Sequence, residues 1–278
     1  MAVSTGLKYL KESALPHQWC SGCGNGVALK ALLRAFEELE YASNQVVVVT
    51  GIGCWGKADI YIRTSALHVT HGRALAYASG IKAANPELHV VVLMGDGDGT
   101  TIGGNHLIHS ARRNMDLTAI IVNNLNYGMT GGQQSAMTPA GSITSTTSYG
   151  NPERAFDICA LAEAAGANYV ARETIYNGQA LKNRMKEALA NKGFSLVEVV
   201  SPCTTLYGPR NNMREPVSML RWLKKDGVPA SEYDKLVNPE ADGYFRTGKL
   251  VSKQAPDFIT RYREIQARVQ GEMAGKQK

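Results

Sequence analysis

Two polar side chains that could hold a divalent cation lie 28 residues apart, each shortly after an apolar run. Asp96 follows Val90–Met94 within a glycine-rich turn, and Asn124 closely follows Thr118–Val122. Both runs are typical of buried strands, and ligands bind at the carboxyl ends of parallel strands. A carboxylate and an amide oxygen beside free backbone N–H groups suit Mg²⁺, which prefers few protein oxygens together with phosphates. The pattern predicts a site for Mg²⁺ and a diphosphate.

Five cysteines occur, at Cys20, Cys23, Cys54, Cys159 and Cys203. The odd number, in a chain expected to be cytosolic, argues against structural disulfides. Cys20, Cys23, Cys54 and Cys203 lie in predicted loops. Cys20 and Cys23 could form a redox pair, or all four could hold a zinc ion or a [4Fe–4S] cluster. A thioredoxin-like pair is disfavoured because no predicted strand precedes it. Spacing does not separate zinc from iron–sulfur. Cys159 lies in a predicted apolar helix, where core packing is expected.

Strand-like and helix-like segments alternate along the first two hundred residues. The predicted strands are Gln45–Thr50, Val90–Met94, Thr118–Val122, Tyr169–Ala171 and Phe194–Val200. The predicted helices between and before them are Val27–Leu39, Ala74–Ala84, Arg154–Ala165 and Gly178–Asn191. This alternation predicts an α/β fold, with a mostly parallel sheet covered by helices on both faces.

Residues 1–208 are expected to form the α/β domain that carries the site, with residues 1–19 as an arm. Residues 209–278 are expected to be an extended C-terminal tail at a subunit interface, with helices at Glu215–Lys225 and Asp257–Met273. Asp226–Pro256 shows little periodicity. The Ser/Thr/Gly-rich segment Ser135–Asn151 predicts a long loop, and such loops are often lids or partner contacts.

Composition favours a globular cytoplasmic protein. Of 278 residues, 19% are charged and 44% hydrophobic, and no apolar run approaches the length of a membrane span. The first residues lack the apolar core of a signal peptide. The net charge is +6, which favours anionic partners such as diphosphates, coenzyme A or an acidic electron carrier. No block of Lys and Arg argues for nucleic acid.

The order Gly95-Asp96-Gly97, helix, apolar strand, Asn123-Asn124 resembles the signature of thiamine diphosphate enzymes. In that family the Asp, the second Asn and a backbone carbonyl two residues later hold Mg²⁺. The resemblance therefore implies Asp96, Asn124 and the carbonyl of Asn126 as ligands.

A narrower resemblance is to the beta subunits of the 2-oxoacid:ferredoxin oxidoreductases. It rests on the segments WCSGCGNG, GIGCWGK, THGRALAYASGIKAANP, GDGDGTTIGGNH, NNLNYGMTGGQ and SPCTTLYG. It implies a [4Fe–4S] cluster on Cys20, Cys23, Cys54 and Cys203 that accepts electrons singly. It also implies thiamine diphosphate, coenzyme A as co-substrate, an alpha subunit and ferredoxin as partners. The segment YGMTGGQ most resembles the 2-oxoglutarate enzymes.

The resemblance also implies contacts to thiamine diphosphate. Backbone N–H groups in glycine turns bind phosphate well. Arg73 could equally face solvent, Met129 could be packing, and His68 and His106 are expected to be structural. The implied contacts are Gly53, Cys54, His71, Gly72, Arg73, Gly95, Asp96, Gly97, Asp98, Asn124, Tyr127, Gly128, Met129 and Thr130.

No glutamate stands in a convincing position to activate the aminopyrimidine ring. The resemblance places that residue on the alpha subunit, so no catalytic residue is assigned to this chain and we expect it to be inactive alone. The expected reaction is oxidative decarboxylation of a 2-oxoacid, 2-oxoglutarate foremost, or the reverse carboxylation. Alternatives are pyruvate or a branched-chain 2-oxoacid as substrate, a non-redox thiamine decarboxylase with structural zinc, and a non-catalytic zinc-stabilised assembly subunit.

Overall fold

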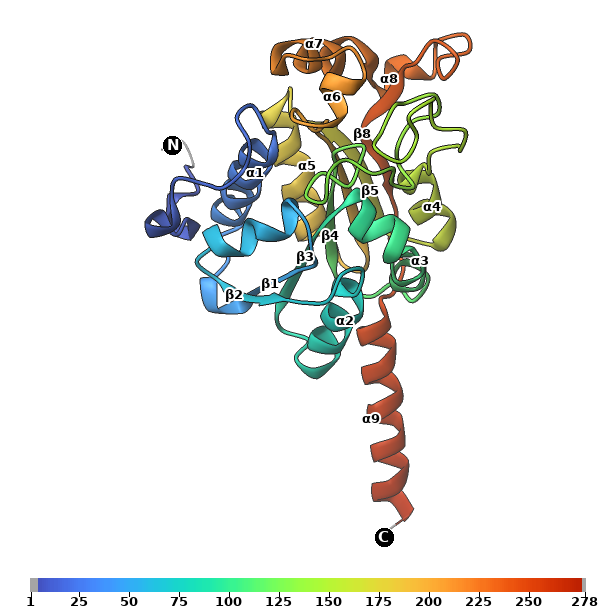
Figure 1. Ribbon diagram of the computed structural model, residues 1–278. Helices are drawn as coiled ribbons and strands as arrows, with labels where there is room; N and C mark the ends of the chain where they lie inside the picture. Colours follow the sequence, from blue (N-terminus) through green and yellow to red (C-terminus); the bar gives the residue numbers. More distant parts are fainter. Residues whose placement is uncertain (1–4, 277–278) are drawn as a thin grey trace.

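The computed structural model describes residues 5–276, and the side chains of residues 5–272. Within this range the strands form one eight-stranded sheet in the order β2-β1-β3-β4-β6-β5-β8-β7 (Figure 1). The strands are β1 (Val46–Thr50), β2 (Ser65–His68), β3 (His89–Gly95), β4 (Thr118–Asn123), β5 (Tyr169–Thr174), β6 (Ser195–Val200), β7 (Gly227–Pro229) and β8 (Phe245–Ser252). Strands β1 to β6 pair in parallel, and β8 runs antiparallel to β5. The predicted mostly parallel sheet is confirmed.

Helices cover both faces of the sheet, as predicted (Figure 1). They are α1 (Asn25–Glu38), α2 (Ala74–Ala84), α3 (Gly104–Arg112), α4 (Ile158–Ala165), α5 (Gly178–Ala190), α6 (Tyr207–Arg210), α7 (Pro216–Asp226), α8 (Ala230–Tyr233) and α9 (Phe258–Lys276). Shorter helical turns are η1 (Leu7–Tyr9), η2 (Glu12–Ala14), η3 (Ser43–Gln45), η4 (Trp55–Tyr61) and the π-helical η5 (Gly97–Ile102).

Alternate residues of the central strands supply two hydrophobic cores. Val91 and Leu93 of β3 pack on the face covered by α1 and α5. Val92 and Met94 pack on the opposite face, against α2, α3 and α4. Because both faces are covered, the strands read as continuous apolar runs rather than as alternating ones.

The parallel pairing brings several strand ends to one edge of the sheet. Thr50, Gly95, Asn123 and Val200 end β1, β3, β4 and β6, and all four strands run in the same direction. The loops that follow therefore share this edge, which is where ligands bind in such sheets.

The segment after residue 208 contributes strands to the main sheet. Strand β8 pairs with β5, and β7 pairs with β8, so the low-periodicity region adds a mixed edge to the parallel core. The predicted interface role of this segment stays a prediction. Helix α9 extends away from the body of the molecule (Figure 1). No helix in the described range is long and apolar enough to span a membrane.

Two local features differ from the sequence-based expectation. Helix α4 begins at Ile158 rather than at Arg154, because the Asp157 carboxylate caps it by accepting hydrogen bonds from the N–H groups of Cys159 and Ala160. In the predicted arm, Tyr9 is buried and its hydroxyl donates to the Phe36 carbonyl at 3.3 Å. The arm is therefore anchored on α1, and its residues 1–4 lie outside the described range.

Candidate functional site

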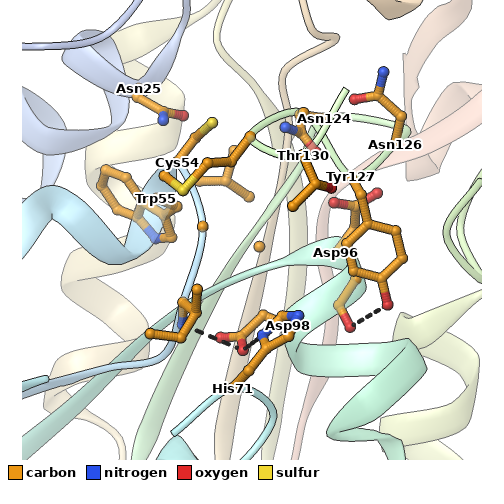
Figure 2. A pocket seen from close by; sticks show the side chains of 17 residues that line it. Asn25, Cys54, Trp55, His71, Asp96, Asp98, Asn124, Asn126, Tyr127 and Thr130 are labelled. Atoms are coloured by element: carbon orange, nitrogen blue, oxygen red, sulfur yellow. Dashed lines mark hydrogen bonds and ion pairs between the residues drawn. The ribbon is translucent and has the colours of Figure 1, made fainter. Parts of the chain in front are cut away.

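A cavity of about 110 Å³ opens at the carboxyl edge of the sheet, between the loops after β1, β3 and β4 (Figure 2). Most of the residues predicted to contact the cofactor line it. These are Gly53, Cys54, His71, Gly95, Asp96, Gly97, Asp98, Asn124, Asn126, Tyr127, Gly128, Met129 and Thr130. The structure thus brings together residues that lie up to 77 positions apart in the chain.

Three oxygen atoms converge where the cation is expected. The Asn124 side-chain oxygen, as oriented here, lies 2.6 Å from Asp96 Oδ1 and 2.7 Å from the Asn126 carbonyl oxygen. Three acceptors this close repel one another, so the arrangement needs either a cation between them or an amide turned to donate. These are the three ligands that the sequence implied, and their chemistry fits Mg²⁺.

Asp96 lies deep in the protein at 2% exposure. Burial, with a smaller contribution from the Glu198 carboxylate, raises the pKa of Asp96 to about 7. Ser135 donates to Asp96 Oδ2 at 2.6 Å, which leaves Oδ1 facing Asn124. Ser135 belongs to the long polar loop, so this loop packs against the site.

The turn that follows β4 is held in an uncommon conformation. Leu125 has a φ of 68°, in the left-handed region that non-glycine residues rarely adopt. Its N–H donates to Asn123 Oδ1 at 3.2 Å, and its carbonyl accepts from Thr138 Oγ1 at 2.8 Å. The turn presents Asn124 and the Asn126 carbonyl on the same side, toward Asp96.

Asp98 joins three segments of the site. Its Oδ1 hydrogen-bonds to His71 Nδ1 (Figure 2). The same oxygen accepts from the Gly72 N–H at 2.7 Å and, at a longer distance, from the Ile52 N–H. Asp98 therefore orients His71 through one ring nitrogen. Gly72 serves this contact and does not line the cavity, and Arg73 is exposed at the start of α2.

The loop after β1 can approach Asp98 only because residue 51 is glycine. A Cβ atom at Gly51 would lie 1.9 Å from Asp98 Oδ2. We expect Gly51→Ala to destabilise the protein by about 1–3 kcal/mol, since a shift of the Asp98 carboxylate would break its hydrogen bonds to His71 and Gly72. Thermal unfolding measures this. Gly80→Ala in α2 is the matched control, because nothing lies within 4 Å of its Cβ position and alanine should stabilise the helix by up to about 1 kcal/mol. Unchanged stability of Gly51→Ala would contradict the packing argument.

Four cavity-lining residues were not predicted: Asn25, Ile52, Trp55 and Val122. Asn25, the first residue of α1, is 2% exposed and faces the cavity beside Cys54 (Figure 2). Its position directly after the Cys-x-x-Cys loop was the only signal in the sequence.

The four cysteines predicted to bind a cluster line a second cavity, of about 240 Å³. Within the described range, no group of three His, Cys, Asp or Glu side chains is arranged to hold a metal ion. Ser201 also lines this cavity, and its buried hydroxyl has no hydrogen-bond partner among the described residues. Burial raises the pKa of Cys54 to about 11, with further contributions from the other three thiols. The fifth cysteine, Cys159, is buried in α4 as predicted.

The two cavities share a wall. Cys54, Asn124, Gly128 and Met129 line both. The Cys203 N–H donates to the Asn124 carbonyl at 3.0 Å, and a Cβ atom at Gly128 would lie 3.6 Å from Cys203 Sγ. The cysteine loop and the Asn124 loop are therefore in direct contact.

Comparison with known proteins agrees with this geometry. The family model described as "Thiamine pyrophosphate enzyme, C-terminal TPP binding domain" matches residues 43–199. A solved structure titled 2-oxoglutarate:ferredoxin oxidoreductase from Magnetococcus marinus, with 2-oxoglutarate, coenzyme A and succinyl-CoA bound, superposes with a TM-score of 0.85. It is 30% identical and covers 97% of this chain and 92% of its own.

Two curated relatives are still more similar in sequence. The 2-oxoglutarate synthase subunit KorB of Methanocaldococcus jannaschii is 42% identical over 266 residues, which is 96% of this chain and 98% of the relative. That of Archaeoglobus fulgidus is 50% identical over 218 residues, 78% of this chain and 79% of the relative. With its thiamine pyrophosphate-binding domain and this likeness over nearly its whole length, the chain belongs to the beta subunits of the 2-oxoacid:ferredoxin oxidoreductases.

Proposed function

We propose that this beta subunit binds thiamine diphosphate through Mg²⁺ and carries a [4Fe–4S] cluster. With its alpha subunit it acts on 2-oxoglutarate and coenzyme A to give succinyl-CoA and CO₂, or runs the reverse carboxylation, with ferredoxin as electron partner. The observation that carries the proposal is the convergence of Asp96, Asn124 and the Asn126 carbonyl at the strand ends. The likeness to KorB subunits supports 2-oxoglutarate as substrate.

The residues of the first cavity would bind and orient the cofactor. Asp96, Asn124 and the Asn126 carbonyl would hold Mg²⁺, whose charge would help to bind the diphosphate. His71, fixed by Asp98, would turn its other ring nitrogen to a phosphate oxygen. Tyr127 and Met129 would line the thiazolium, whose chemistry when bound is that of an electron sink for decarboxylation. Gly72 would contribute indirectly, because its N–H donates to the Asp98 carboxylate that fixes His71. Arg73 would remain at the surface.

The likeness to the 2-oxoglutarate:ferredoxin oxidoreductase structure favours an iron–sulfur cluster over zinc in the second cavity, because zinc has no redox chemistry. The four cysteines line this cavity together with the buried Ser201 hydroxyl, which has no hydrogen-bond partner among the described residues. Cys20 is exposed, and Cys54 lies against the first cavity. Cys20, Cys23, Cys54 and Cys203 would hold the cluster between the first cavity and the surface, and the chemistry that it would supply there is single-electron transfer.

No glutamate lines the first cavity within the described range. We therefore predict that the chain alone shows no 2-oxoacid-dependent dye reduction and that co-expression with the alpha subunit restores it.

A panel of 2-oxoglutarate, pyruvate and branched-chain 2-oxoacids on the purified complex should show the highest kcat/KM for 2-oxoglutarate. Robust activity of the single chain would refute the division of the site, and a preference for pyruvate would refute the substrate. A cytoplasmic location stays a prediction.

A further inference from the structure

A network of buried polar side chains runs from the Asn124 turn to helix α4 and takes no part in the site as described. Glu198 of β6 is 2% exposed and lies at the centre of the network. Its Oε1 accepts from Asn123 Nδ2 at 2.9 Å, and its Oε2 accepts from Arg172 Nε at 2.7 Å. Arg172 in turn donates from Nη2 to Asp157 Oδ1 at 2.6 Å.

Sheet geometry brings these side chains together. Glu198 is in register with Ile121 of β4 on one side and with Arg172 of β5 on the other. Leu196, two residues before Glu198, and Ile121, two residues before Asn123, both pack in the core under α4. Because side chains alternate between the faces of a sheet, Glu198 and Asn123 point to that same face. The thiol of Cys159 in α4 lies 3.4 Å from Glu198 Oε2.

Both polar groups of the Asn123 side-chain amide have hydrogen-bond partners. The Nδ2 group donates to Glu198, and Oδ1 accepts from the N–H of Leu125, whose φ is 68°. A left-handed, non-glycine residue of this kind persists only where its surroundings hold it. If the Asn123 amide turned, Leu125 would lose this partner and the turn would relax. Glu198 prevents the turning, because an NH₂ group, not a carbonyl oxygen, must face the carboxylate.

We propose that Glu198 is a positioning residue for the magnesium site. Through Asn123 it holds the turn that aims the Asn124 amide oxygen and the Asn126 carbonyl at Asp96. Arg172 keeps the Glu198 carboxylate in place, and its pairing with Asp157 anchors the network on α4. Residues that hydrogen-bond to the ligands of a metal ion, without binding the ion themselves, set the orientation of those ligands in this way. The proposal rests on the proposed magnesium site.

The test is the affinity of Mn²⁺, used as the spectroscopic probe for the cation, for the purified two-subunit complex with thiamine diphosphate, titrated by electron paramagnetic resonance. We expect Glu198→Gln to weaken Mn²⁺ binding roughly 10- to 100-fold, which is the usual effect of replacing a residue that supports a metal ligand. Asn123→Ala should weaken it to a similar degree. Since Glu198 acts through Asn123, the double variant should bind Mn²⁺ no more weakly than the weaker single variant.

The matched control is Asp116→Asn, at a carboxylate just before β4 that lies outside the network. It breaks the ion pairs of Asp116 Oδ2 with Lys82 and Lys192, each 2.7 Å long, and leaves the contacts of Glu198 intact. We expect its Mn²⁺ affinity to stay within about twofold of the wild type, even where its thermal stability falls. If Glu198→Gln fails to fold, Asn123→Ala carries the test alone, because it leaves the Arg172–Glu198 pair intact.

Wild-type Mn²⁺ affinity in either Glu198→Gln or Asn123→Ala overturns the inference, and so do losses that multiply in the double variant. An equal loss in Asp116→Asn also overturns it, because the effect would then follow general destabilisation. Absence of thiamine-dependent Mn²⁺ binding in the wild-type complex would be a different result. It would remove the proposed magnesium site itself.

Discussion

Replacing Asp96 with asparagine should remove nearly all 2-oxoacid-dependent activity of the complex, a loss of roughly three orders of magnitude or about 4 kcal/mol. Asp96 is the only charged member of the three converging oxygens, and asparagine fills the same volume without the charge that holds a divalent cation. Binding of thiamine diphosphate should become weak and should depend on millimolar Mg²⁺.

Calorimetric titration of thiamine diphosphate at several Mg²⁺ concentrations measures this effect. The folded state should tolerate the change, because burying a neutral amide costs less than burying a carboxylate. Asp242→Asn, at an exposed carboxylate of the C-terminal segment, is the control and should behave as wild type. Undiminished Mg²⁺-dependent binding in Asp96→Asn would mean that the cation is held elsewhere.

Replacing Cys203 with alanine should remove the cluster and leave the thiamine site loaded. Iron and acid-labile sulfide should fall from about four each per chain to near zero, with loss of the brown colour and of electron transfer to ferredoxin. Thiamine diphosphate and Mg²⁺ should still bind, because the Cys203 backbone N–H that donates to the Asn124 carbonyl is kept. The two cofactors are thereby separated in one variant.

Cys159→Ala is the matched control for Cys203→Ala, because Cys159 is buried in α4 and does not line the cysteine cavity. It should retain iron, sulfide and colour and lose only about 1 kcal/mol of stability for the missing sulfur. Metal analysis and the absorption spectrum before and after dithionite distinguish the outcomes. Zinc in place of iron in the wild-type complex would eliminate the electron-transfer role.

Local pattern determined the strands and the ligand types. Apolar runs such as Val90–Met94 and Thr118–Val122 favour buried strands, because they are short, rich in β-branched residues and followed by turn residues. The turns after them contain oxygen-bearing side chains suited to Mg²⁺, so Asp96 and Asn124 were candidates, and parallel pairing explains why they meet. The resemblance added the Asn126 carbonyl, since a backbone atom has no residue type to read.

Tertiary packing determined the features that the local sequence pattern does not predict: the edge strands, part of the cavity lining and the buried polar network. The edge strands β7 and β8 show little periodicity in sequence, so only the pairing of β8 with β5 and of β7 with β8 reveals them. Asn25 reaches the cavity from the start of α1. Asp98 lines the cavity and also binds the turn that contains His71 and Gly72. Asn123, Arg172 and Glu198 of the Glu198 network lie in three different strands and up to 75 positions apart. Their proposed role follows from the register between these strands, a long-range property that the sequence of one strand does not show.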